Sequence, residues 1–388
     1  MSNVAIFSTG VLSAAGLASY FYSKRSAQKP KVFGRADSEF RQLLCEHCAV
    51  LRATYHPPWW AAFGNLQTGL SQLLRSCPEL PFERELFKYS DGGCSALDWL
   101  HPEKLGVITN NNVVESKPIV LVLPGLTGSS RNSSYVLHLL QQVNELGYRS
   151  VVFNMRGVET DLLTSRTFCA TSSDDVQQII EHVHARFPTA PLLLCGFSLG
   201  GMLSFRYLGE HANDAVRCAI KGAMIISAPW DPLKSTVTFE EFWPRVLFNR
   251  HLVANLKQLI SPYRHLFETQ LDWQKVMAAE TVREFDAAFV VPMFGYRDWE
   301  HYYTEASLGK HVHKIRVPTL CLTAADDCFA PVHSIPLDDI NESANVVLVL
   351  TEHGGHTAFL KGVHDTGLTE DLFVEFSHVV LEHICTKK

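Results

Sequence analysis

Short runs of apolar residues alternate with amphipathic stretches over most of the chain. Strands are predicted for the runs at residues 119–123, 150–154, 191–196, 219–227, 317–323 and 346–350. Helices are predicted near residues 135–146, 174–187, 201–211 and 368–383, where apolar residues recur at helical spacing. Strands that are apolar throughout are typical of a sheet covered on both faces. The pattern therefore predicts an α/β fold with a mostly parallel central sheet and helices on both faces.

Two stretches depart from this alternation. Residues 83–90 and 95–100 form short alternating runs on either side of Asp91-Gly92-Gly93, which predicts a hairpin ahead of the parallel strands. Between about residues 232 and 310, aromatic residues and helical spacing replace the strand pattern. An insertion longer than an ordinary loop usually covers a site. We expect it to form a helical cap.

The N-terminus predicts a membrane anchor. Residues 4–22 carry no charge, which is about the length of one bilayer crossing, and five basic residues follow by position 35. Because Ser, Thr and Gly dilute the stretch, a cleaved signal peptide and a soluble or peripheral helix stay open as alternatives. We expect residues 1–28 to be a single-pass anchor in the endoplasmic reticulum or another endomembrane, with its orientation open. An extension over residues 29–80 and a main domain over residues 81–388 would follow.

Composition excludes several classes of protein. Hydrophobic residues make up 46% and charged residues 19% of the 388 residues, which is typical of a globular chain. The formal net charge is −6 and no basic block follows the first thirty-odd residues, so we expect no nucleic-acid partner. Cys45 and Cys48 form a lone C-x-x-C without a second pair, which is weak evidence for a metal or redox site.

The clearest chemical motif is Gly196-Phe197-Ser198-Leu199-Gly200, a G-x-S-x-G between a predicted strand and a predicted helix. In that context the flanking glycines allow a strained turn that lifts the Ser198 hydroxyl above the sheet. A serine in an ordinary structural turn is the alternative. An active serine needs a base and an orienting carboxylate. The sequence therefore has to supply an acid and then a histidine after Ser198.

Two later loops supply these groups. Asp326 and Asp327 follow the predicted strand at 317–323, and His356 in Gly354-Gly355-His356 follows the last predicted strand. Successive residues that leave a strand point to opposite sides, so we do not expect the two to share the role. We expect Asp327, four residues before Pro331, to be the acid and Asp326 to support the loop. His353, three residues earlier, is the reserve candidate for the histidine. A zinc site at His353 and His356 would need further ligands. We expect no metal and no organic cofactor.

A tetrahedral intermediate also needs two backbone donors for its oxyanion. The N–H of Leu199 begins the helix after Ser198, and the N–H of Leu126 lies in the glycine loop Pro124-Gly125-Leu126-Thr127-Gly128 after a strand. We expect these two groups to form the oxyanion hole. Tight turning alone would also explain the glycines in that loop.

Several segments together resemble one family. They are 121–128, 151–158, 162–167, 196–201, 294–296, 325–327 and 354–356. From about residue 81 to residue 362 the chain resembles the membrane-anchored α/β-hydrolase-domain-containing proteins one to three, and most of all the third, a phospholipase-type member. The resemblance implies the α/β-hydrolase fold, a triad of Ser198, an Asp and His356, an N-terminal anchor, and lipid esters such as phosphatidylcholines or acylglycerols as substrates.

These observations together predict a membrane-tethered serine hydrolase that cleaves lipid carboxylic esters through an acyl-enzyme. Two alternatives stay open. A lipid acyltransferase would use the same catalytic groups with an alcohol or lysolipid acceptor in place of water. A catalytically silent receptor or scaffold would keep the fold without the activity. An epoxide hydrolase or dehalogenase is not expected, because the turn carries Ser198 where those enzymes need Asp.

Overall fold

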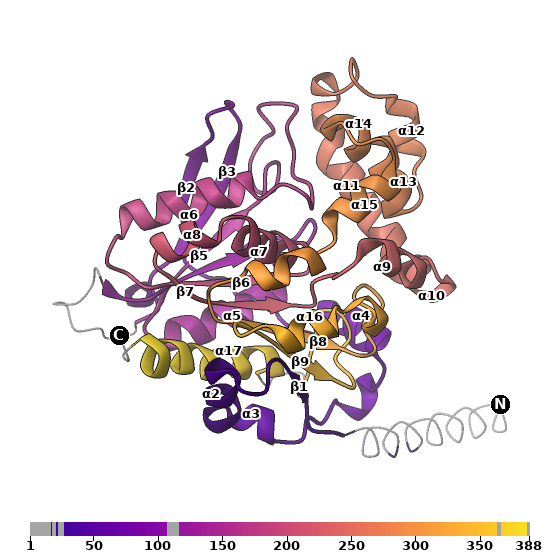
Figure 1. Cartoon of the computed structure of the whole chain (residues 1–388). Coiled ribbons are helices and arrows are strands. Elements are labelled where there is room, and N and C mark those ends of the chain that lie inside the picture. The colour runs from indigo at the N-terminus through magenta and orange to yellow at the C-terminus, as the bar shows by residue number, and fades with distance from the viewer. Residues whose placement is uncertain (1–16, 18–20, 22–26, 107–115, 363–365, 386–388) are drawn as a thin grey trace, which may run out of the picture.

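A single mixed sheet organises the protein (Figure 1). The computed structural model describes residues 17, 21, 27–106, 116–362 and 366–385. Within these residues the sheet has nine strands, in the order β1 (Lys31–Phe33), β9 (Val346–Thr351), β8 (Thr319–Ala324), β7 (Ile220–Ile226), β6 (Leu192–Phe197), β4 (Ile119–Leu123), β5 (Arg149–Asn154), β3 (Cys94–Leu100) and β2 (Glu83–Lys88). The six strands from β9 to β5 run parallel, whereas β1, β3 and β2 join antiparallel at the edges. The predicted mostly parallel sheet and the predicted hairpin are confirmed.

The strand sequences explain why both faces of the sheet are covered. Along β4, Leu121 and Leu123 contribute to the core on one face, whereas Val120 and Val122 contribute to the core on the other. Successive side chains of a strand point to opposite faces, so a strand without polar residues needs a cover on each side. All five residues of β4 are buried.

Two sets of helices provide these covers. One face carries α2 (Glu39–His47), α3 (Ala49–Arg52), α5 (Ser134–Glu145), α17 (Leu368–His378) and η8 (Val379–Ile384). The other face carries α6 (Asp174–Arg186), α7 (Leu199–Glu210), α8 (Ala212–Arg217), η6 (Gly309–Lys314) and α16 (Leu337–Glu342). Two short 3-10 turns, η2 (Pro102–Leu105) and η7 (Val332–Ser334), lie in connections. The helices near residues 135–146, 174–187, 201–211 and 368–383 therefore form within a few residues of their predicted limits.

Residues 29–80, predicted as an extension, pack on the sheet and its covering helices, which we call the body. The segment adds β1 to the edge of the sheet beside β9, and α2 packs against the C-terminal helix through Phe40 and Phe376. It continues with η1 (Trp59–Ala61) and α4 (Gly64–Leu74). The predicted anchor at residues 1–28 falls for most of its length outside the described residues. No helix in the part of the chain that the structure describes is long and apolar enough to cross a bilayer.

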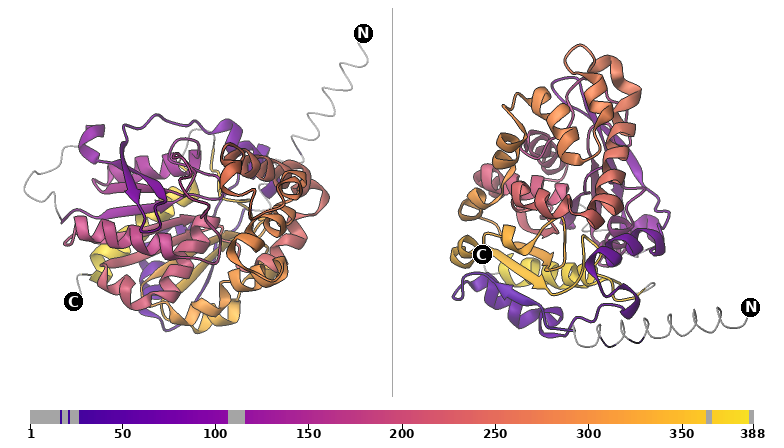
Figure 2. Two further views of the ribbon diagram at one scale, coloured as in Figure 1. Left: turned by 90° about the horizontal axis from the view of Figure 1, so that it is seen from above. Right: turned by 90° about the vertical axis from the view of Figure 1, so that its right-hand side faces the viewer.

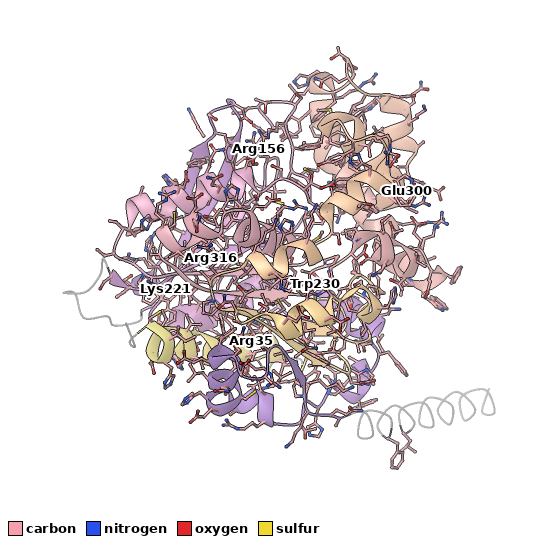
Figure 3. The ribbon with its side chains drawn as sticks, in the orientation of Figure 1. Arg35, Arg156, Lys221, Trp230, Glu300 and Arg316 are labelled. Carbon is pink, nitrogen blue, oxygen red and sulfur yellow. The ribbon has the colours of Figure 1, made fainter. Side chains whose placement is uncertain are left out.

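The residues between β7 and β8 build a helical layer on one side of the body, which is visible in all views (Figures 1 and 2). Its elements are α9 (Pro232–Phe239), α10 (Phe242–Pro244), η4 (Arg245–Asn249), α11 (Arg250–Ile260), η5 (Ser261–Leu266), α12 (Trp273–Ala278), α13 (Val282–Ala288), α14 (Val290–Phe294) and α15 (Trp299–Ala306). We call this layer the cap. Trp230 is buried where the chain enters the cap (Figure 3). Its carbonyl oxygen accepts a hydrogen bond from the N–H of Leu308, where the chain returns.

Candidate active site

Ser198 occupies a strained turn between β6 and α7. Its φ of 51° and ψ of −118° lie in a region that L-residues rarely adopt. The turn needs small neighbours, because a Cβ at Gly200 would lie 2.2 Å from the carbonyl oxygen of Leu123, and one at Gly196 would lie 2.6 Å from that of Gly200. The helix begins at Leu199, two residues earlier than the pattern predicts, because the turn passes directly into it.

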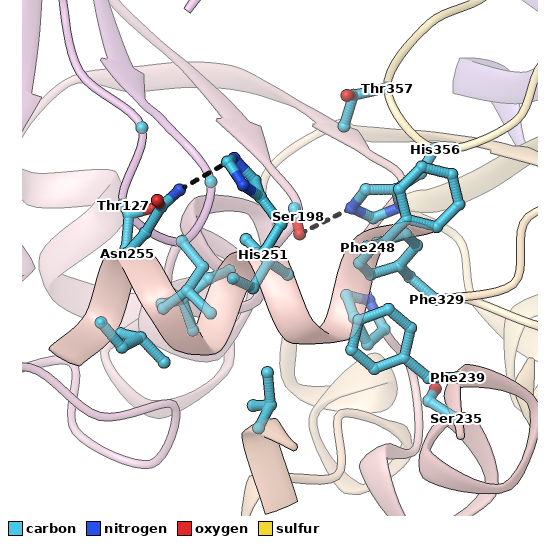
Figure 4. Close-up of a pocket in the computed structure, with 18 of the residues that line it drawn as sticks. Thr127, Ser198, Ser235, Phe239, Phe248, His251, Asn255, Phe329, His356 and Thr357 are labelled. Carbon is cyan, nitrogen blue, oxygen red and sulfur yellow. Dashed lines mark hydrogen bonds between the residues drawn. The ribbon is translucent and has the colours of Figure 1, made fainter. Parts of the chain in front are cut away.

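The side chains of Ser198, His356 and Asp327 form one hydrogen-bonded chain. His356 Nε2 lies 2.8 Å from Ser198 Oγ (Figure 4). On the other side of the ring, Nδ1 lies 2.9 Å from Oδ2 and 3.1 Å from Oδ1 of Asp327. Asp327 is buried, and its Oδ1 also accepts hydrogen bonds from the N–H groups of Phe329 and Ala330. The carboxylate is thereby held toward the histidine ring.

The neighbouring carboxylate has a different partner. Asp326 Oδ2 lies 2.9 Å from Nδ1 of His353, and Asp326 Oδ1 accepts a hydrogen bond of 2.9 Å from the N–H of Gly355. The two aspartates therefore face different histidines, as expected for successive residues that leave a strand. Asp326 and His353 hold the loop that carries His356, and the structure does not bring them to Ser198.

The glycine loop 124–128 runs beside Ser198. A Cβ at Gly125 would lie 3.2 Å from the Cβ of Ser198, and the N–H of Gly125 donates to the Tyr135 hydroxyl at 3.1 Å. Leu126 and Leu199 both line the pocket that contains Ser198. The two residues predicted to supply the oxyanion donors therefore both lie near Ser198. Because the N–H of Gly125 is bound to Tyr135, the next backbone donor in the loop is the N–H of Leu126.

Ser198 and His356 lie on the wall of a large apolar pocket of about 1120 Å³. Its other walls come from the cap and from α4, which belongs to the segment predicted as an extension. At the mouth, large apolar side chains are exposed to solvent: Phe63, Leu66 and Leu73 from α4 and the residue before it, and Trp243 and Leu247 from the cap. We call these five residues the apolar rim. A pocket of this size and lining suits a long hydrocarbon chain.

One carboxyl group lies in the cap wall of the pocket. Burial raises the pKa of Asp286 to about 7, although the hydroxyl of Tyr303 donates a hydrogen bond of 2.9 Å to its Oδ2. Burial also raises the pKa of Tyr303 well above its usual value. The burial that raises this pKa favours the uncharged carboxyl group, which makes this wall less polar than its sequence implies.

Metal ligation has no geometric basis in the described residues, where no group of three or more His, Cys, Asp or Glu side chains is arranged to hold an ion. Cys45 and Cys48 are free cysteines.

Two further residues contact the histidine, and neither was predicted from the sequence. Phe329 stacks on the His356 ring with centroids 4.0 Å apart, and Thr68 accepts a hydrogen bond from the His356 backbone. Neither residue lies in a motif, so no local signal identifies them.

The fold and this site define an α/β hydrolase, and the sequence model described as "alpha/beta hydrolase fold" matches residues 118–363. Protein abhd-3.2 of Caenorhabditis elegans is 38% identical over 367 residues, which cover 93% of this chain and 94% of that protein. Phospholipase ABHD3 of Homo sapiens is 37% identical over 367 residues, with coverage of 94% and 88%. Monoacylglycerol lipase ABHD2 of Homo sapiens is 27% identical over 373 residues, with coverage of 89% and 84%.

The chain belongs to the α/β-hydrolase family and, within it, to the ABHD3-like proteins. This confirms both the fold and the resemblance drawn from the sequence.

Proposed function

We propose that this protein is a serine hydrolase that cleaves carboxylic esters of lipids, either phospholipids or acylglycerols, through a triad of Ser198, His356 and Asp327. One observation carries the proposal: the hydrogen-bonded chain from Ser198 Oγ through His356 to Asp327 lies on the wall of an apolar pocket. The names of two relatives, a phospholipase and a monoacylglycerol lipase, support the lipid substrate class.

The proposed reaction proceeds in two halves. Ser198 Oγ attacks the ester carbonyl carbon while its proton passes to His356 Nε2, and Asp327 stabilises the imidazolium through Nδ1–H. The N–H groups of Leu126 and Leu199 bind the oxyanion of the tetrahedral intermediate. Collapse breaks the ester C–O bond, and His356 returns the proton to the leaving alcohol. Water then attacks the acyl-enzyme with His356 as base, which releases the fatty acid and restores Ser198.

The test uses the full-length protein in membranes. A fluorophosphonate should label the wild type and fail to label Ser198→Ala. Wild type should release fatty acid from phosphatidylcholine or monoacylglycerol, and Ser198→Ala should lose about 10⁴ to 10⁶ of the rate. Activity of that variant within tenfold of the wild type would remove Ser198 from the mechanism. An unlabelled wild type would favour a silent receptor or scaffold, and acyl transfer to an added lysolipid in preference to water would favour an acyltransferase.

We further propose that the enzyme works at an endomembrane to which residues 1–28 tether it. The apolar rim supports this proposal, because exposed apolar side chains at a pocket mouth favour contact with lipid. Carbonate washing should leave the full-length chain in the membrane pellet, and deletion of residues 1–28 should release much of it. Residual binding of the deleted form is expected from the rim. Release of the intact chain by carbonate would exclude a membrane-spanning anchor.

A further inference from the structure

The loop that carries His356 is held by four side chains from three separate parts of the fold. Residues 352–360, after β9, contain no helix or strand, so their buried N–H groups need other acceptors. The acceptors are Oδ1 of Asp326 for Gly355 at 2.9 Å, Oγ1 of Thr68 for His356 at 2.8 Å, Oγ of Ser227 for Thr357 at 3.1 Å, and Oε1 of Gln67 for Leu360 at 3.0 Å. Two of the four acceptors belong to α4.

A hydrogen bond within α4 orients the Thr68 hydroxyl for this contact. Its hydroxyl donates to the carbonyl oxygen of Gly64 at 2.9 Å, which leaves an oxygen lone pair for the N–H of His356. Thr68 is buried, and its partner on the loop lies 288 positions later in the chain. The bond therefore joins the N-terminal segment directly to the backbone of the proposed base.

Close packing of backbone atoms reinforces the contact. A Cβ at Gly355 would lie 2.3 Å from the carbonyl oxygen of Gly64 and 2.5 Å from Oγ1 of Thr68. A Cβ at Gly64 would lie 2.3 Å from the carbonyl oxygen of Asp326. Helix α4 thus contacts both the turn that bears the acid and the loop that bears the histidine, with no side chain between them. Gly355, Thr357 and Phe359 all have positive φ, so external contacts must hold this loop in place.

We propose that Thr68, on α4, is a positioning residue, which holds His356 in line with Ser198 and Asp327. The inference rests on the triad proposed above. Helix α4 lies outside the region 118–363 that the family's sequence model matches, so that region alone is not the complete catalytic unit. The same helix lines the pocket through Leu66, Leu70 and Leu73, and it therefore couples the substrate mouth to the histidine loop.

The test compares full-length Thr68→Val, Thr68→Ala and Thr68→Ser. Valine keeps the shape of threonine but leaves the N–H of His356 without its acceptor. We expect Thr68→Val to lower kcat about 10- to 100-fold, because small displacements of reacting groups have effects of this size, while KM stays within about twofold. Fluorophosphonate labelling of Ser198 should slow by a similar factor. Thr68→Ser keeps the hydroxyl and should recover kcat to within about threefold of the wild type.

Ser71→Ala is the matched control. Ser71 is buried one turn later on α4, and its hydroxyl donates to the carbonyl oxygen of Thr68 within the helix. Unfolding temperatures are measured for every variant. If Thr68→Val does not accumulate, Thr68→Ala is expected to lose about tenfold in kcat. The inference is overturned if kcat of the Thr68 variants matches that of the wild type, or if Ser71→Ala loses as much. Either result leaves the triad standing, since that depends on Ser198→Ala.

Discussion

The two walls of the pocket are built in different ways. On the wall of the body, glycines bring backbone atoms into direct contact, and side-chain acceptors hold the loop that carries His356. The cap wall is lined mainly by aromatic and aliphatic side chains, and Arg283 and Glu240, an ion pair of the cap, do not line the pocket. The body wall therefore fixes the positions of the reacting side chains. The cap wall only needs apolar side chains of suitable total volume, and many combinations would meet that need.

Phe329 contacts both walls. The ring of Phe329 stacks on His356, and it also lies 4.3 Å from the ring of Phe239 in α9 and 5.6 Å from that of Phe248 in η4 (Figure 4). Phe329 follows Asp327 by two residues, and its N–H donates to that carboxylate. Through this aromatic cluster the cap contacts the proposed triad, which makes the comparison open to test.

The largest effect is expected on the body wall. Asp327→Asn keeps the size of the side chain and removes the charge that stabilises the imidazolium, so kcat should fall by about 10³ to 10⁴. Asp326→Asn is the matched control, because its carboxylate faces His353 and Gly355. It should lose far less kcat and show a lower unfolding temperature. Steady-state kinetics on both variants decide the matter, and a larger catalytic defect at Asp326 would transfer the role of acid to that residue.

A smaller effect is expected where the walls meet. Phe329→Leu keeps apolar volume and removes the stacked ring, so kcat should fall roughly 3- to 10-fold. Phe239→Leu alters only the cap side of the cluster and should change kcat less than twofold. Single-turnover kinetics separate the chemical step from binding. Equal losses in the two variants would mean that the cap, and not the ring on His356, controls the histidine.

On the cap wall itself we expect effects on binding alone. The double variant Trp243→Ser, Leu247→Ser removes two members of the apolar rim and should raise KM for lipid vesicles about 3- to 5-fold, with kcat within twofold. Val237→Ser is the control, because Val237 is exposed on α9 but does not line the pocket. A short water-soluble ester should be cleaved equally by all three proteins. A fall in kcat for the double variant would contradict the expectation that the cap wall affects binding and not the chemical step.

The smallest effect concerns stability and pH. The pKa of Asp286 is about 7 in the folded protein against an ordinary value of 3.8. Between these values the unfolded chain has lost the proton that the folded protein still binds, so stability falls as pH rises from about 4 to 7 and then levels off. Asp286→Asn should remove this loss. It should stabilise the protein by on the order of 1–2 kcal/mol at pH 8 and by almost nothing at pH 4.

Unfolding temperatures of the wild type and Asp286→Asn across this pH range check the expectation. Asn can still accept the hydrogen bond from Tyr303, so the variant changes mainly the charge. A difference between the two proteins that does not depend on pH would show that Asp286 titrates normally.

Most of the sheet and part of the site could be predicted from local patterns. The apolar run at β4 predicts a doubly covered strand because burial on both faces excludes polar residues from every position. Gly196 and Gly200 mark the turn at Ser198 because a Cβ at either would clash with backbone atoms. The spacing from Asp327 to Pro331 favoured that aspartate over its neighbour, and the structure places it against His356. Its catalytic role stays a prediction.

By itself the sequence predicted the six parallel strands, the hairpin, four helices beside the sheet, the position of the serine turn, and an acid and a histidine in loops after later strands. These features depend on interactions between near neighbours, which leave a periodic or spaced pattern. Only the tertiary structure decided that β1 pairs with β9, that Phe329 stacks on His356, and that Thr68 binds the histidine loop 288 positions away. Such contacts leave no local pattern, because an ordinary threonine or phenylalanine gains its role from packing that brings distant segments together.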